Sequence, residues 1–171
     1  LYDKGVNIMD HIDKGKYENI ERERSIEVSY DLQAGSYIKS YRSNPEKFEN
    51  YYEEIGSILH EYVGEGQSIL DCGTGEMTTL CGVISKIGKE LDEIYAFDIS
   101  VSRIDMGRRF FRKNIRSRGM VNYFVANMSS IPMPRSSIDV VWTSHAVEPN
   151  SNKAGEIIGE ILRVARQKVL L

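Results

Sequence analysis

Hydrophobic and polar positions divide this sequence into a polar N-terminal part and a part in which two rhythms alternate. Residues 1–43 are polar and carry many tyrosines, and their hydrophobic positions recur only weakly at helical spacing. Residues 44–63 are strongly amphipathic, with Asn44 as the expected N-cap, Pro45 at the first helical position and a glycine at the stop. We therefore predict a helix over residues 44–63, within a helical N-terminal extension over residues 1–65.

Short apolar runs alternate with amphipathic stretches over residues 66–171. The apolar runs have the length of strands, and the stretches between them carry hydrophobic residues at helical spacing. Strands are predicted over residues 68–72, 93–99, 121–126 and 138–144, with a fifth beginning at 168–171, and helical stripes over 80–91, 104–115 and 153–166. The alternation predicts an α/β fold with a doubly wound, mostly parallel sheet covered by helices on both faces.

The length of the chain bounds its organisation. Its 171 residues suffice for one compact unit with a core, and not comfortably for two. We therefore expect residues 1–65 to form a lid on a ligand-binding domain over residues 66–171. The first residue is not methionine and the last four residues only begin a strand. We therefore expect a piece of a longer protein, in which the C-terminal strands are missing.

Composition and charge exclude several classes of function. The net charge is −3, so the chain as a whole is not a polycation built for nucleic acid or anionic lipid. No apolar stretch has the length of a transmembrane helix, and no group of His, Cys and Asp has the spacing of metal ligands. Two cysteines, Cys72 and Cys81, are too few for a disulfide framework. We expect a cytoplasmic protein with no membrane partner and no metal, in which both cysteines and Trp142 are buried.

One segment departs from this charge balance. Seven basic residues lie between Arg103 and Arg118, and they allow either an RNA-binding patch or a solvated helix face. We favour the solvated face, because Phe110 and Phe111 on the same helix are expected to face the sheet. Nucleic acid is therefore not an expected partner, although a phosphorylated or nucleotide-linked acceptor is compatible with this segment.

The segment "ILDCGTGEMT", residues 69–78, follows the first strand of the alternating part. Ligands of an open parallel sheet bind at the carboxyl ends of its strands, and Gly73 and Gly75 let the backbone turn there and approach a ligand closely. Asp71 and Glu76 add negative charge where a dinucleotide would place its pyrophosphate. This charge argues against an NAD(P)-linked oxidoreductase, the first alternative, and favours a nucleoside that carries an ammonium or sulfonium group.

The following strand ends also carry polar side chains. Asp98 can accept hydrogen bonds from both ribose hydroxyls, and the Asn127 amide oxygen can accept one from an adenine amino group, unless that residue only forms the loop. After the fourth strand, His145 is a candidate general base, with a wall or hydrogen-bonding role as its alternative. Glu148 is a weaker candidate for the same task.

Taken together, these segments resemble a known family. The set "ILDCGTGE", "AFDIS", "VANMSSIPMP", "IDVVWTSHAVEPN" and "EIIGEILRVARQKVLL" resembles, in order and spacing, the class I S-adenosylmethionine-dependent methyltransferases over residues 66–171. The resemblance implies a Rossmann-like methyltransferase fold and S-adenosyl-L-methionine as the cofactor. The sequence departs from the pattern at Asn127, where an aspartate is more usual, and at Met77, where many such loops have a third glycine.

The resemblance also implies how the cofactor is held. Asp71 and the glycine loop would lie by its methionine part, Asp98 by the ribose, and Asn127 with Met128 by the adenine. The segment "EVSYDLQAGSYIKSY" is similar to the entry segment of small-molecule methyltransferases encoded with surface-polysaccharide genes, which folds over the cofactor, so Gln33 and Ser36 are further lid candidates. The implied cofactor-binding residues are Asp71, Gly73, Thr74, Gly75, Asp98, Ile99, Asn127, Met128, Tyr30 and Tyr37.

The expected function is methyl transfer to an oxygen or nitrogen of a small-molecule or sugar-linked acceptor, with His145 removing the proton of a hydroxyl acceptor. A non-catalytic cofactor-binding or partner module is the second alternative. A homodimer is compatible with the sequence. The acceptor itself stays open, because specificity in this fold lies in loops and appended segments.

Overall fold

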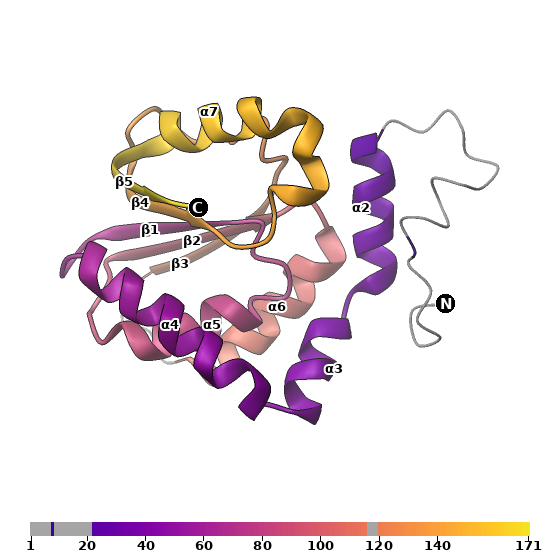
Figure 1. The fold of residues 1–171 in the computed structure, drawn as a ribbon, viewed down its shortest axis with the longest axis horizontal. Coiled ribbons are helices and arrows are strands. Elements are labelled where there is room, and N and C mark those ends of the chain that lie inside the picture. Colours follow the sequence, from indigo (N-terminus) through magenta and orange to yellow (C-terminus); the bar gives the residue numbers. More distant parts are fainter. Residues whose placement is uncertain (1–7, 9–21, 116–119) are drawn as a thin grey trace.

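The computed structural model describes residue 8 and residues 22–115 and 120–171. Five parallel strands form one sheet in the order β3-β2-β1-β4-β5 (Figure 1). The strands are β1 (Ser68–Cys72), β2 (Glu93–Asp98), β3 (Met120–Val125), β4 (Ile138–Thr143) and β5 (Ala165–Leu170). The strand order reverses between β1 and β4, and ligands of such sheets bind at this switch point, outside the carboxyl ends of the strands.

Helices cover both faces of the sheet, as the alternating pattern predicted. The helices are α2 (Arg22–Gln33), α3 (Ser36–Ser43), α4 (Glu46–Tyr62), α5 (Thr78–Ile87), α6 (Val101–Asn114) and α7 (Ala154–Val164), with a 3₁₀ turn, η2 (Glu148–Lys153), before the last. Figure 1 shows α7 on one face and α4, α5 and α6 on the other. The prediction of a doubly wound α/β fold is therefore confirmed.

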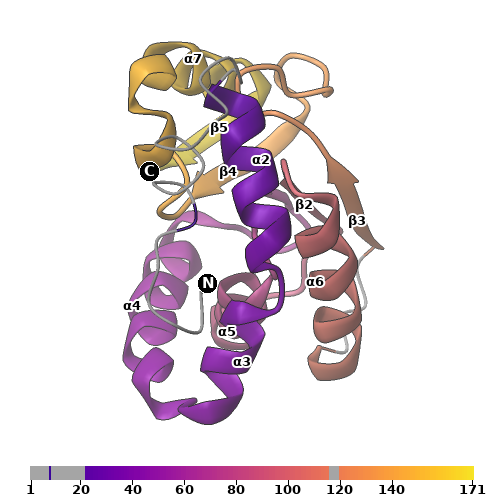
Figure 2. The same ribbon diagram turned by 90° about the vertical axis from the view of Figure 1, so that its right-hand side faces the viewer.

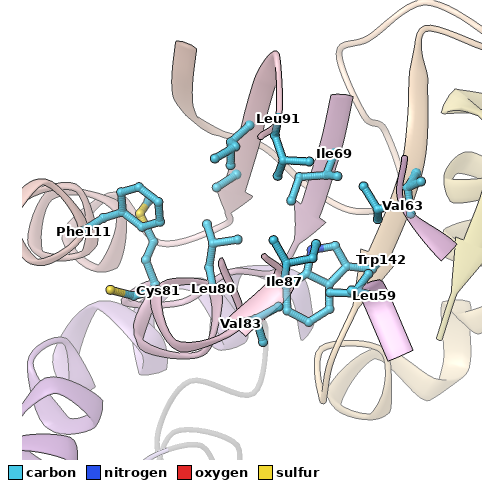
Figure 3. Close-up of a cluster of buried hydrophobic side chains, with 14 of the residues drawn as sticks. Leu59, Val63, Ile69, Leu80, Cys81, Val83, Ile87, Leu91, Phe111 and Trp142 are labelled. Atoms are coloured by element: carbon cyan, nitrogen blue, oxygen red, sulfur yellow. The ribbon is translucent and has the colours of Figure 1, made fainter. Parts of the chain in front are cut away.

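The two faces bury separate hydrophobic cores, because successive side chains of a strand point to opposite faces. In β1, Ile69 belongs to the core under α4, α5 and α6, whereas Leu70 belongs to the core under α7. Figure 3 shows part of the larger core, where Trp142 packs with Leu59 and Ile87. The expected burial of Trp142 and of both cysteines is confirmed.

The N-terminal helices α2 and α3 lie at the side of the sheet near the carboxyl ends of its strands (Figure 2). Their weak periodicity has a physical reason, because each contributes few apolar side chains to the interior, among them Ile26 and Ile38. Helix α4 packs instead on α5, with the Tyr52 ring so close to Gly82 that a Cβ there would lie 2.1 Å from it. The division into a lid over residues 1–65 and a domain over residues 66–171 stays a prediction.

Three predicted element ends differ from the structure. Asn44 ends α3 rather than capping α4, since its backbone N–H donates to the Ser40 carbonyl and α4 begins two residues later. Helix α5 ends at Ile87, and Leu91 is buried in the following loop. Helix α7 gives way to β5 at Ala165, so the predicted helix over residues 153–166 was too long and the fifth strand starts earlier.

Most of the predicted solvated helix face is as expected. Phe110 and Phe111 are buried and the cations in the last two turns of α6 are exposed, but Arg103 is 4% exposed. Arg116 and Arg118 of the same basic run lie outside the described residues. Among the described residues, no helix is both long and apolar enough to cross a bilayer.

Candidate functional site

A cavity of ≈ 450 Å³ lies at the carboxyl ends of the strands, under α2 and α3. This volume is within the range of small-molecule and cofactor sites. The predicted site residues that line it are Tyr30, Tyr37, Gly73, Thr74, Gly75, Asp98, Ile99, Asn127, Met128 and His145. The chain therefore brings together ten predicted site residues from five separate segments, whereas Asp71, Glu148 and the lid candidates Gln33 and Ser36 do not line the cavity.

The glycine loop forms the floor of the cavity between β1 and α5. Gly73 and Gly75 have φ angles of 75° and 56°, which favour glycine. The backbone N–H groups of Gly73 and Thr74 both donate to the Phe97 carbonyl at 2.9 Å. A Cβ on Gly73 would lie 2.3 Å from the Cβ of Ala146, so the loop and the segment after β4 touch here. Glycine is thus required at position 73 by conformation and by space.

The absent third glycine is compensated from another helix. Met77 takes a left-handed conformation, with φ 58°, and its side chain is fully buried. Gly107 on α6 leaves room for it, because a Cβ at Gly107 would lie 2.9 Å from the Met77 Cγ. Close packing of helix and loop is therefore achieved with the glycine on the neighbouring helix.

Glu76 has a role that the sequence did not indicate. It is 1% exposed, and its carboxylate accepts hydrogen bonds from the backbone N–H groups of Gly35 at 2.9 Å, Tyr37 at 3.4 Å and Ile38 at 2.8 Å. An acidic side chain at these unpaired N–H groups stabilises the start of α3. The Glu76 carboxylate is therefore bound by backbone N–H groups of the protein. The sequence-based argument, in which its charge only repels a pyrophosphate, was incomplete.

Asp98 presents a buried carboxylate to the cavity. It is 5% exposed, and its two oxygens accept from the backbone N–H of Gly75 and of Ser100, each at 2.9 Å. Burial raises the pKa of this carboxyl. Each carboxylate oxygen can accept a second hydrogen bond, so the group has capacity left for two ligand hydroxyls.

Asp71 lies beneath the loop and does not line the cavity. It is 4% exposed, and burial raises the pKa of Asp71 to about 7, with the neighbouring charge of Asp98 acting in the same direction. Its predicted part in cofactor binding stays a prediction.

Asn127 forms the turn after β3. Its amide oxygen accepts from the backbone N–H of Ser129 at 3.0 Å and from the Ser129 hydroxyl at 2.9 Å. These hydrogen bonds match the loop-forming alternative for Asn127. The residue also lines the cavity, beside Met128. Its role in holding an adenine stays a prediction.

Arg103 is a residue of the site that sequence reasoning missed. Its guanidinium lies 4.2 Å from the centroid of the Tyr30 ring and 4.9 Å from that of the Tyr37 ring, and its Nε donates to the Tyr30 carbonyl at 3.4 Å. Such contacts are favourable and strengthen when desolvated. The sequence could have indicated Arg103 by its position in the first helical turn after Asp98, at the carboxyl edge of the sheet.

The opposite end of the cavity is built by α4 and the segment after β4. The Tyr51 hydroxyl is hydrogen-bonded to the Ser144 hydroxyl, and the Tyr51 ring stacks on His145 with centroids 6.0 Å apart. The Nδ1 of His145 lies 3.2 Å from the Glu148 carboxylate. This pairing orients the imidazole, whose other nitrogen is then available to a ligand. Tyr51 and Ser144 carry no motif that the sequence could have revealed.

The residues present fit a cationic nucleoside cofactor. Asp98 supplies the acceptors that ribose hydroxyls need, and Ile99 and Met128 supply apolar walls for a base. Asp98 faces the cavity and Asp71 lies buried beside the glycine loop, and in their ionised forms these carboxylates suit a ligand with a sulfonium and an ammonium group. Among the described residues, no three His, Cys, Asp or Glu side chains gather as metal ligands would.

Comparison with known proteins gives relatives of one kind. Residues 70–171 match the family model of the methyltransferase domain. A curated relative, the ubiquinone/menaquinone biosynthesis C-methyltransferase UbiE of Escherichia coli, is 32% identical over 93 residues, which are 53% of this chain and 36% of that protein. The chain thus spans about a third of the length of the curated relatives it matches.

Solved structures agree with this comparison. An S-adenosylmethionine-dependent methyltransferase from Methanosarcina mazei is 26% identical, with a TM-score of 0.55 over 63% of this chain and 51% of that one. Magnesium protoporphyrin IX methyltransferase from Synechocystis, solved with bound S-adenosylhomocysteine, has a TM-score of 0.64 over 84% of this chain and 69% of that one. At 11% identity, the second likeness concerns the fold alone.

Proposed function

The chain belongs to the methyltransferase domain family, the class I S-adenosylmethionine-dependent enzymes, and we propose from this that it transfers a methyl group from S-adenosylmethionine to a small-molecule acceptor. The observation that carries the proposal is the buried Asp98 carboxylate, which faces the cavity beside a glycine loop whose backbone lines it. When bound, the cofactor supplies a methyl group activated by its sulfonium.

The chain's own residues hold the donor and exclude water. Asp98 would accept from the ribose hydroxyls, Ile99 and Met128 would enclose the adenine, and the loop from Gly73 to Gly75 would lie along the methionine part. The α2–α3 segment closes the cavity through Tyr30 and Tyr37, whose rings pack on Arg103. Such positioning of donor and acceptor is the protein's main contribution to a group transfer.

The acceptor is proposed to lie beside the stacked pair of Tyr51 and His145, at the end of the cavity that these two residues line. With Nδ1 directed to Glu148, the His145 Nε2 can take the proton of an acceptor hydroxyl or amine as the methyl group is transferred. This base serves an acceptor whose oxygen or nitrogen carries a proton, whether the acceptor is free or sugar-linked. A carbon acceptor is the second candidate, because the curated relative is named a C-methyltransferase.

Calorimetric titration of the chain with S-adenosylhomocysteine and, separately, with NADH tests the proposal. We expect binding of S-adenosylhomocysteine and none of NADH, because the Asp71 carboxylate beneath the glycine loop disfavours a pyrophosphate there. Binding of NADH alone would assign the chain to the oxidoreductase alternative. Binding of neither would favour a non-catalytic module.

A further inference from the structure

Helices α2, α3 and α6 share one side of the molecule (Figure 2). A second hollow lies on this side. It is a groove of ≈ 510 Å³ between α3 and α6, and it shares no lining residue with the cofactor cavity. Its lining residues are Gly35, Ile38, Lys39, Arg42, Ser43, Met106, Arg109, Phe110 and Lys113. The methyl-transfer proposal uses none of them.

The groove concentrates positive charge. Four of its lining side chains, Lys39, Arg42, Arg109 and Lys113, are cationic, and no described residue that lines it is acidic. Of these cations, Arg109 is itself paired with Asp105 at 2.5 Å, and the same carboxylate is shared with Arg108 at 2.7 Å, so two cations share one acid. A chain with a net charge of −3 thus presents a local cationic surface, which attracts anions at short range.

Exposed apolar side chains lie on the same three helices, and one of them, Met106, lines the groove itself. Leu32 is 64% exposed, Val101 58%, Tyr37 48% and Met106 40%. The end of α2 that carries Leu32 is held at the start of α6, which carries Val101, because Asp31 accepts hydrogen bonds from Ser100 and Ser102. Met106 lies against Gly35, since a Cβ on that glycine would be 3.3 Å from the Met106 methyl carbon.

These apolar residues and the cations of the groove come from three helices that share one side of the molecule (Figure 2), here called the α2–α3–α6 face. A monomeric domain seldom exposes several large apolar side chains together unless they meet a partner. Apolar residues flanked by Lys and Arg are the composition with which proteins enter the headgroup region of a bilayer that contains anionic lipid.

We propose that the α2–α3–α6 face docks on an anionic phospholipid surface. The cations contact lipid phosphates, with the groove receiving a headgroup, while Leu32, Val101 and Met106 enter the acyl boundary. This docking needs no membrane-spanning segment. Neither the net charge of the chain nor the hydropathy of its sequence reveals such a surface, because both describe the chain as a whole or a long apolar stretch.

Lipid fits this face better than nucleic acid does. Single strands are bound by cations together with aromatic platforms for base stacking. Of the four exposed apolar side chains named above, Tyr37 alone is aromatic, and its ring already contacts Arg103. Exposed aliphatic side chains have no use against a phosphate backbone, whereas a bilayer buries them.

Co-sedimentation with vesicles tests the proposal without an enzymatic assay. We expect the chain to bind vesicles of equal parts phosphatidylcholine and phosphatidylglycerol, more weakly as salt rises, and not to bind phosphatidylcholine vesicles. The double variant Arg42→Gln/Lys113→Gln should lower the partition coefficient about 30-fold, from the affinity that each basic residue adds near an anionic surface. The control Arg135→Gln/Lys168→Gln removes the same charge from the loop before β4 and from β5, and should bind as the unmodified chain does.

A second variant separates lipid from other polyanions. Leu32→Ser/Val101→Ser leaves every cation in place and should also weaken vesicle binding several-fold, with unchanged circular dichroism. Binding of polyuridylate that falls with the charge variant and ignores the apolar one would assign the face to nucleic acid and overturn the proposal. Equal sedimentation with neutral and anionic vesicles would overturn it as well, and so would equal losses in the control variant.

Discussion

The Glu76 carboxylate accepts a hydrogen bond from the backbone N–H of Gly35 at 2.9 Å, although the two residues are 41 positions apart. The same carboxylate also holds the N–H of Ile38 at 2.8 Å. Because Glu76 directly follows the glycine loop, one buried side chain joins the start of α3 to the floor of the cofactor cavity. The α2–α3 segment and the glycine loop are therefore expected to respond together to changes at this residue.

Removing the Glu76 carboxylate tests this link. Glu76→Ala leaves three N–H groups of α3 without their acceptor, so we expect a loss of about 1–3 kcal/mol in the free energy of unfolding. Urea denaturation of both proteins measures it. Glu54→Ala on the exposed side of α4 is the matched control and should change stability little. Equal stability of Glu76→Ala and the unmodified chain would contradict the capping role.

Gly73→Ala should destabilise the chain for two separable reasons. The new Cβ would lie 2.3 Å from the Ala146 Cβ, and φ 75° is unfavourable for alanine. Ala146→Gly in the same chain removes the collision but not the backbone strain, so thermal unfolding should show partial rescue. Gly155→Ala on α7, where no atom lies within 4 Å of the new Cβ, should be neutral or stabilising. Full rescue would show that the conformation at Gly73 costs nothing.

Asp98→Ala should lower the affinity for S-adenosylhomocysteine by well over tenfold. The side chain provides the buried acceptors proposed for the ribose, and a ligand hydroxyl left without a partner in a closed site is costly. Calorimetry at one pH measures the change. Asp105→Ala on the outer side of α6 is the control carboxylate and should bind normally. Because Asp98 also holds the Gly75 N–H, thermal unfolding without ligand should accompany each titration. Unchanged affinity would refute the ribose assignment.

The affinity for S-adenosylhomocysteine should depend on pH through Asp71. Burial raises the pKa of Asp71 to about 7, so the group is mostly neutral at about pH 6 and mostly charged at about pH 8. The charged form attracts the ammonium of the ligand, so we expect affinity to rise several-fold over this interval. Asp71→Asn should flatten the dependence. A profile that Asp71→Asn leaves unaltered would locate the titrating group elsewhere.

Asp139 should make the fold sensitive to acid. Burial alone would raise the pKa of Asp139, but hydrogen bonds from Ser68 and the guanidinium of Arg166 outweigh it and hold the pKa below its ordinary value. A carboxyl with a lowered folded-state pKa contributes stability above its unfolded pKa of about 3.9, and this contribution is lost as pH falls through the folded value.

Asp139→Asn should therefore be less stable than the unmodified chain at about pH 7, by about 1–3 kcal/mol, with the difference shrinking toward about pH 3. Urea denaturation at both pH values measures this. A difference that stayed constant with pH would show that the bonds, and not the charge, carry the effect.

The sequence by itself determined the layers of this protein and the places where chemistry gathers. Strand-length apolar runs that alternate with amphipathic stretches can bury their hydrophobic side chains only in a parallel sheet covered on both faces. Such a sheet collects its strand ends at one edge, so Gly73, Asp98, Asn127 and His145 could be assigned to one cavity before any coordinates. Glycine spacing and a carboxylate at a strand end are recognised from neighbouring positions in the chain, so they can be predicted from the sequence.

Only the tertiary structure decided which groups are paired across long separations. The bond between Glu76 and α3, the stacking of Arg103 between two tyrosines and the contact of Tyr51 with His145 each join segments that no pattern connects. The same holds for the α2–α3–α6 face, where cations and aliphatic side chains from three helices share one surface. The strength of a hydrogen bond or an ion pair depends on which groups surround it in space. The sequence does not show which distant residues become neighbours when the chain folds.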